Sequence, residues 1–136
     1  MIGTSNGPCP VDKEMVLDYM ENGFLDNIID LFRHEPACIP MIIDMLTDER
    51  IRVKFGATAL VEELIKSHLG HLQRLIPQLG DLLKHDSPVV RADSAYVLGM
   101  LGLRDALPYL EASLDEDNPV VLEIIQEAID EIISRG

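Results

Sequence analysis

Apolar residues recur every three or four positions along most of this chain, which is the spacing that places them on one face of a helix. The clearest stripes are Leu75, Leu79 and Leu82 or Leu83, followed by Ala92, Ala95, Leu98 and Leu101. No segment alternates apolar and polar residues as a half-buried strand would. The pattern predicts helices over residues 39–46, 50–67, 72–83, 88–101, 106–114 and 119–133, after two shorter ones that begin past Asp12 and near Phe24.

The turns between these helices repeat the same residue types. An aspartate lies between the two helices of each of the last three pairs, at Asp48, Asp86 and Asp117. Ser87 and Asn118 are each followed by proline, which is the order typical of an N-cap residue and the first helical position. Each pair of helices is therefore predicted to form a hairpin with a short turn.

A constant offset of 31 residues, as from Pro77 to Pro108, relates the last two hairpins. The other matched pairs are Leu79 with Leu110, Leu83 with Leu114, Asp86 with Asp117 and Pro88 with Pro119. A fixed period of this size is typical of stacked repeat proteins, because one hairpin alone cannot cover its own apolar surface. We therefore expect an all-α fold, an α-solenoid built as a superhelical stack of about four helical hairpins. It would form a single domain over residues 11–136, after a flexible N-terminal tail over residues 1–10.

Composition agrees with helix-on-helix packing. Of the 136 residues 47% are hydrophobic, only 4% are aromatic and none is Trp, so Leu, Ile, Val, Ala and Met must fill the core. The two cysteines, Cys9 and Cys38, form neither a metal-binding pair nor a disulfide framework, so we expect them to be reduced. The N-terminus lacks the features of a signal peptide and no apolar run is long enough to span a membrane, so we expect a cytoplasmic protein.

The charge balance narrows the choice of partners. A formal net charge of -13 disfavours nucleic acid and anionic membranes, which attract basic proteins. Residues 105–134 contain many carboxylates and neither Lys nor Arg. This acidic region is either a solvated face that keeps the protein soluble or a docking surface for a basic partner.

One stretch of the chain carries a family resemblance. Asp86-Ser87-Pro88-Val89-Val90-Arg91, followed by Ala95 and Leu98, resembles the turn and second-helix start of a HEAT repeat. The short, phycobilisome-lyase-like HEAT repeats are the subgroup that it resembles most. The resemblance is strong over residues 72–133, moderate over residues 39–67 and weak before Glu35.

The resemblance implies a ladder in which an arginine pairs with acids of the turns. Arg91 and Asp86 fit this ladder, whereas the third repeat has Leu122 at the arginine position. In the first repeat the equivalent residue is Val53, or Lys54 if the register slips by one. The missing arginine of the third repeat is what a terminal, capping repeat would show.

The resemblance also implies that the second helix of each hairpin faces a concave groove. Residues on the side opposite Ala92, Ala95 and Leu98 are then candidates for binding a partner. The apolar candidates are Ile51, Phe55, Tyr96, Met100, Val120 and Ile124, and the acidic ones are Glu123, Glu127 and Glu131. The alternative is that some of these residues pack against the neighbouring repeat.

No motif for catalysis, cofactor binding or metal binding is found. His34-Glu35 is a single pair where a two-iron site would need several, and His68 and His71 lack a third ligand. We therefore expect no catalytic residue, no cofactor and no metal. The predicted function is a non-catalytic protein-protein interaction module or small scaffold. The alternatives are an accessory subunit or chaperone of an enzyme, as the lyase-like resemblance implies, and a metal-dependent HEAT-like enzyme. The partner would be another protein, and a basic one would suit the acidic region; the apolar ends of a short stack also allow a homo-oligomer.

Overall fold

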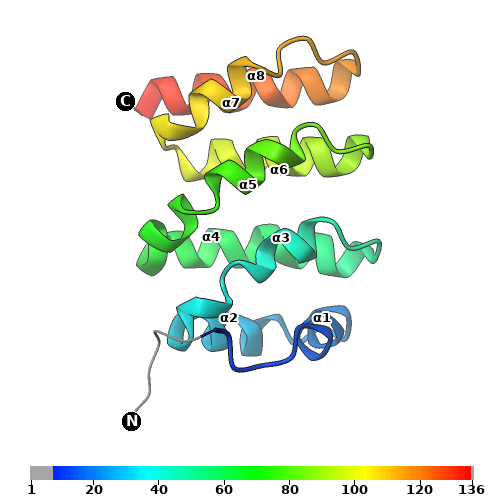
Figure 1. Ribbon diagram of the computed structural model, residues 1–136, viewed down its shortest axis with the longest axis vertical. Coiled ribbons are helices and arrows are strands. Elements are labelled where there is room, and N and C mark those ends of the chain that lie inside the picture. The colour runs from blue at the N-terminus through cyan, green and yellow to red at the C-terminus, as the bar shows by residue number, and fades with distance from the viewer. Residues whose placement is uncertain (1–7, 136) are drawn as a thin grey trace. The chain divides into compact units, whose positions relative to one another are not determined.

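Helices provide all the regular secondary structure of residues 8–135, the part of the chain that the computed structural model describes (Figure 1). Contacts divide the chain into two units, Met1–Leu72 and Gln73–Gly136. The first contains α1 (Lys13–Glu21), α2 (Leu25–His34), a 3-10 turn η1 (Pro36–Cys38), α3 (Met41–Leu46) and α4 (Ile51–Gln73). The second contains α5 (Ile76–Leu82), α6 (Pro88–Leu101), a 3-10 turn η2 (Arg104–Ala106), α7 (Leu107–Glu111) and α8 (Pro119–Arg135). The predicted single domain over residues 11–136 stays a prediction.

The first unit begins as the sequence predicts. Asp12 caps α1 by accepting a hydrogen bond from the Met15 backbone N–H at 3.1 Å. The chain then turns at Gly23, whose φ of 90° is in the left-handed region that favours glycine. The predicted end of the fourth helix at residue 67 is wrong, because α4 continues to Gln73 through a kink at His68. The extra turn buries Leu72, and that burial favours continuing the helix.

Cys9 and Cys38 form a disulfide, so the prediction of reduced cysteines is wrong. Their Cα atoms are 4.6 Å apart, within the range that a disulfide requires. Cys38 ends η1 and is fully buried. The chain reversal between α1 and α2 returns the polypeptide to its start, which brings together two residues 29 positions apart. The bond also fixes part of the predicted flexible tail, while residues 1–7 of that tail lie outside the described part.

The second unit consists of two hairpins, α5 with α6 and α7 with α8. Ser87 accepts a hydrogen bond from the Val90 N–H, and Asn118 accepts from the Val120 N–H at 3.0 Å, so both predicted N-caps are confirmed. Gly102 ends α6 with a φ of 69°. The helix α6 has the predicted bounds, whereas α7 is shorter than the predicted helix over residues 106–114.

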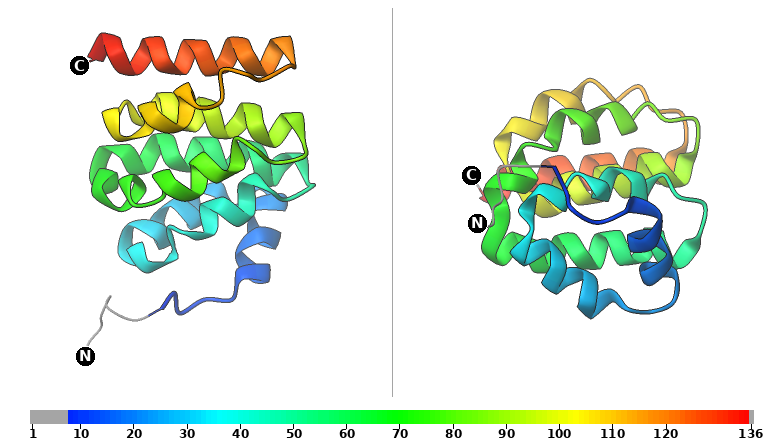
Figure 2. Two further views of the ribbon diagram at one scale, coloured as in Figure 1. Left: turned by 45° about the horizontal axis from the view of Figure 1, so that its top comes forward. Right: turned by 60° about the horizontal axis from the view of Figure 1, so that its bottom comes forward.

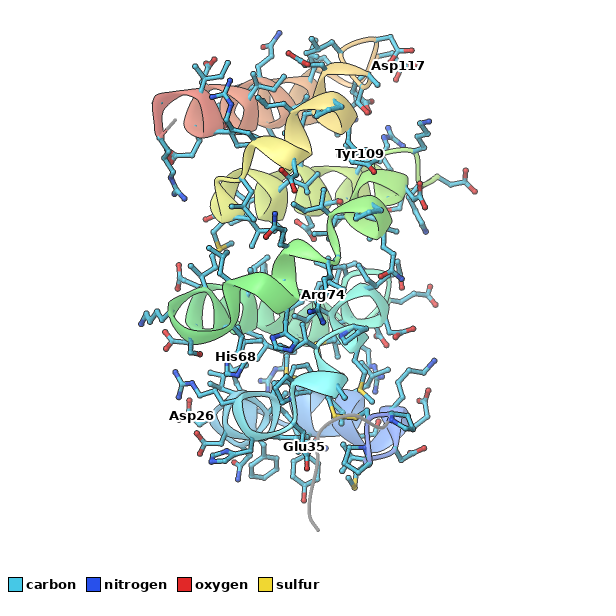
Figure 3. The ribbon with its side chains drawn as sticks, turned by 60° about the vertical axis from the view of Figure 1, so that its left-hand side comes forward. Asp26, Glu35, His68, Arg74, Tyr109 and Asp117 are labelled. Carbon is cyan, nitrogen blue, oxygen red and sulfur yellow. A yellow bond between two sulfur atoms is a disulfide. The ribbon has the colours of Figure 1, made fainter. Side chains whose placement is uncertain are left out.

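The helices α6 and α8 pack against each other and run in the same direction (Figure 1, and Figure 2, left). Gly99 lies where they approach most closely, since a Cβ added there would be only 2.9 Å from the Ala128 Cα. Two small residues thus set the distance between the helices. Elsewhere in the unit, the Tyr109 ring (labelled in Figure 3) lies against Gly80 and fixes α5 beside α7 in the same way.

The arginine ladder differs from the prediction in its carboxylate. The Arg91 guanidinium donates to both carboxylate oxygens of Glu116, at 2.8 and 3.0 Å, and to the backbone carbonyls of His85 and Asp86. The Asp86 side chain is therefore not the partner. Glu116 takes this role because it lies in the following turn, close to the start of α8, while the Asp86 carboxylate points into solvent.

The structure also decides the register of the first repeat. The Lys54 ammonium donates to the backbone carbonyl of Asp48, six residues earlier, just as Arg91 donates to His85. Val53 is fully buried in the core. Lys54 is therefore the residue equivalent to Arg91, and the register that matches Val53 to Arg91 is wrong.

Within residues 8–135, every helix is too short or too polar to cross a membrane.

Candidate functional site

The residues predicted to bind a partner are divided between the two units. Ile51 and Phe55 belong to the first unit and lie one turn apart near the start of α4. Their side chains are 67% and 71% exposed, the largest values among the big apolar side chains of the described residues. They are therefore open to solvent, and the prediction that they contact a partner remains to be tested.

The second unit brings five of the predicted residues together around one hollow. The hollow has a volume of about 260 Å³ and lies between α6 and α8. Its lining is Tyr96, Gly99 and Met100 from α6, with Ile124, Glu127, Ala128, Glu131 and Arg135 from α8. We call this hollow the α6–α8 groove. Two predicted residues, Val120 and Glu123, are exposed on α8 but do not line it.

Backbone geometry explains why a groove forms there. Gly99 and Ala128 have almost no side-chain volume, so the surface is recessed where α6 and α8 are in contact. Larger side chains border this recess, with Tyr96 55% exposed and Met100 and Ile124 half-buried. The result is a concave surface with an apolar floor and one exposed aromatic ring, which is a common form of binding site.

Arg135 is the residue of the groove that sequence reasoning missed. Its Nη1 donates to the Met100 backbone carbonyl at 3.0 Å, and its Nη2 lies 3.6 Å from the Glu131 carboxylate. The guanidinium also lies against Gly102, where no side chain blocks it. The spacing of four residues between Glu131 and Arg135 indicated the ion pair, but nothing in the sequence indicated the contact with α6.

A second hollow, of about 580 Å³, lies in the first unit between α2 and α4. Its lining is Leu25, Asp26, Ile29, Asp30 and Arg33 from α2, with Ala59, Glu62 and Glu63 from α4. Arg33 bridges the two helices, with its guanidinium 3.2 Å from Glu63 and 3.8 Å from Asp30. Asp26 projects from the outer surface of α2 (Figure 3). No sequence pattern indicates this acidic hollow, because its residues come from α2 and α4, which belong to separate hairpins.

The titratable groups with shifted pKa values lie in the turns or, for Arg91, in the first turn of α6, and none lines either hollow. The hydrogen bond from Arg91 lowers the pKa of Glu116, and the hydrogen bond from Arg50 lowers the pKa of Asp48. Arg50 also donates to Asp18 on α1 at 2.9 Å, so it stabilises the turn between α3 and α4. These shifts arise from ion pairs that hold hairpins together.

The histidines considered as metal ligands have local polar neighbours. His34 Nδ1 lies 2.8 Å from the Asp30 carbonyl, and His68 Nδ1 lies 2.7 Å from the Ser67 hydroxyl. Within residues 8–135, no group of three or more His, Cys, Asp or Glu side chains is arranged to hold a metal ion.

Comparison with known families identifies the repeat. The sequence model of HEAT repeats matches residues 59–130, which is more than half of the chain. No curated protein and no solved structure gives a significant match. HEAT repeats generally act as protein-interaction scaffolds, and the predicted fold class, an all-α solenoid, is confirmed. The match covers α5, α6 and α7 in full and most of α4 and α8, and the chain therefore belongs to the HEAT-repeat family.

Proposed function

We propose that this protein is a non-catalytic protein-interaction module that binds a segment of another protein in the α6–α8 groove. The observation that carries the proposal is the groove itself, which combines an exposed tyrosine with an apolar floor and a carboxylate border. An exposed concave surface of this kind is more typical of a binding site than of a surface that only faces solvent.

The groove residues are of the types that anchor protein interfaces. Tyrosine is enriched among the residues that contribute most to binding, because its ring buries a large area with few rotatable bonds. Methionine adapts its shape to different apolar partners, so Met100 suits a surface that receives a side chain from outside. Tyr96 and Met100 lie one turn apart on α6 and face Ile124 across the groove. We therefore infer that one apolar side chain of the partner is buried among these three residues.

The charge of the groove and of its surroundings favours a basic partner. The Glu127 carboxylate has no hydrogen bond or ion pair with any residue in 8–135, and the Glu131 carboxylate pairs there only with Arg135. The net charge of -13 adds a long-range attraction for cations, which raises association rates at low salt.

Peptide selection on the purified protein tests the proposal. We expect a random peptide library to yield peptides that bind the protein and share an apolar residue with nearby Lys or Arg. Their binding should be lost in a Tyr96→Ala variant, because Tyr96 is the most exposed large apolar side chain that lines the groove.

Leu114→Ala is the matched control, since Leu114 is also an exposed apolar side chain of the second unit but lies outside the groove. Selected peptides should bind this variant as they bind the unchanged protein. A library that yields no binder, or binders that tolerate Tyr96→Ala, would contradict the proposal.

The oxidation state of the two cysteines indicates the kind of cellular compartment in which the protein is found. Cytosolic thiols are normally kept reduced, so the disulfide between Cys9 and Cys38 counts against the predicted cytoplasmic location. Thiol titration of the protein, taken from its native cells under acid quench, would distinguish the two cases. Two free thiols support the cytoplasm, and their absence supports an oxidising compartment.

A further inference from the structure

We propose that the α6–α8 groove recognises the order of apolar and basic residues in its partner. It would bind a polypeptide segment in which these two kinds of residue lie in separate blocks. The apolar block would lie over Tyr96 and Ile124, and the basic block over Glu127 and Glu131. This inference rests on the proposed function and adds the arrangement of the partner's side chains along the groove.

The two helices give the groove a direction. Because α6 and α8 are parallel (Figure 1), both contribute their middle turns at one end of the groove and their last turns at the other. Ile124 lies three residues before Glu127 and seven before Glu131. With a rise of about 1.5 Å per residue, the carboxylates follow the apolar contact by roughly 4.5 to 10 Å along the groove.

Several features make the later end of the groove favourable for a cation. Glu127 is exposed and unpaired among the described residues, so its charge is available to a ligand. The C-terminal ends of both parallel helices are there, and each carries a partial negative charge from its free carbonyls. The chain's own Arg135 already uses one of these carbonyls, at Met100, together with the Glu131 carboxylate. A guanidinium is thus accommodated at this end of the groove within the protein itself.

No carboxylate of the described residues lines the earlier end of the groove. Tyr96 and Ile124 line it with apolar surface, and Val120, one turn before Ile124, is 66% exposed and extends that surface along α8. Glu123 is exposed on the same helix but outside the lining of the groove. A basic side chain placed over the apolar end would lose water without gaining an ion pair, which is unfavourable.

The spacing determines what kind of segment fits. An extended chain advances about 3.3 Å per residue, and side chains two residues apart point to the same side, so a Lys or Arg two residues from the apolar anchor would reach the carboxylates. A segment that alternates apolar and basic residues places all its apolar side chains on one side and all its basic ones on the other, so it cannot satisfy both ends of the groove at once. We therefore expect the order of residues, and not composition alone, to determine affinity.

Two short fluorescent peptides of identical composition test this inference by anisotropy. In one peptide the Leu and Arg residues form separate blocks joined by Gly, and in the other they alternate. We expect the block peptide to bind at least about fivefold more tightly, because only it can place every side chain against its complement. Equal affinity for the two peptides would overturn the inference.

Charge-removing variants locate the basic block. Glu127→Gln combined with Glu131→Gln should weaken binding of the block peptide by roughly 2- to 30-fold, at about 1.4- to 5.4-fold per exposed carboxylate. The control Glu111→Gln combined with Asp115→Asn removes the same two charges from α7 and the turn after it, outside the groove, and should leave affinity unchanged. An equal effect of the control and of the groove variant would also overturn the inference, since it would indicate only a general effect of net charge.

The two proposals fail in different ways. If library-selected peptides bind at Tyr96 while neither designed peptide does, the directional inference is wrong and the proposed function stands. If no peptide of either kind binds, both are wrong.

Discussion

Reduction of the Cys9–Cys38 disulfide should strongly destabilise the first unit. The bond closes a loop between residues 29 positions apart, and opening it restores freedom to the unfolded chain. The chain-entropy relation gives about 3.5 kcal/mol for a loop of this length at 25 °C. Small domains are stable by only about 5–15 kcal/mol, so this is a large fraction of the total.

Urea unfolding with and without dithiothreitol measures the effect. The reduced protein keeps both cysteine side chains, so its loss of stability reports the bond and not a change in packing around buried Cys38. Cys9→Ser is the matched control. Even without dithiothreitol, this variant should unfold at the lower urea concentration expected of the reduced protein. Adding dithiothreitol should not lower its unfolding midpoint further.

Hydrogen exchange shows where stability is lost. The unit Gln73–Gly136 contains no cysteine, so its amide protection under native conditions should change less than that of α1 and α2. Two free thiols in the unreduced, denatured protein would show that the bond does not form. A loss below about 1 kcal/mol despite a proven bond would refute the loop-entropy reasoning.

Four further predictions concern packing and charge. Gly99→Leu should lower the free energy of unfolding in urea by roughly 1–3 kcal/mol, because the larger side chain forces α6 and α8 apart. Gly70→Ala should stabilise α4 by about 0.5–1 kcal/mol, because a Cβ added there meets no atom within 4 Å. Leu98→Ala should lower stability by about 2–5 kcal/mol in thermal unfolding, since Leu98 is fully buried in α6, and an unchanged melting temperature would contradict that packing. The pKa of Glu116 is lowered in the folded state by the hydrogen bond from Arg91, so the stability it adds is complete above its usual pKa of 4.5 and is lost as pH falls through the lower folded value. Glu116→Gln should therefore flatten the pH dependence of urea unfolding below about pH 4.5, and an unchanged acid slope would show that this ion pair does not contribute.

Local patterns were sufficient for the helices and their caps. The bounds of α6 follow from Ser87 and Pro88 at its start and Gly102 after its end, and the structure agrees with them. The 31-residue offset predicted a stack of repeated hairpins, and the match to the model of HEAT repeats confirms this prediction. Such features depend on residues within a few positions of one another, so a sequence shows them directly.

The candidate site was only partly predictable. Helical geometry put Tyr96, Met100 and Ile124 on one side of their helices, and the structure brings these residues together around the α6–α8 groove. The depth of the groove depends on how closely Gly99 approaches Ala128, a contact between different hairpins. Periodicity gives the direction in which a side chain points but not the distance between two helices.

The sequence alone determined that this protein is an acidic stack of helical hairpins with an apolar and acidic second-helix face. Only the tertiary structure decided that Cys9 bonds to Cys38, that Arg91 pairs with Glu116 instead of Asp86, and that Arg135 reaches the last turn of α6. The physical reason is the same in each case. Helix formation is governed by neighbours along the chain, whereas these contacts join residues 25 or more positions apart and exist only after the helices have packed.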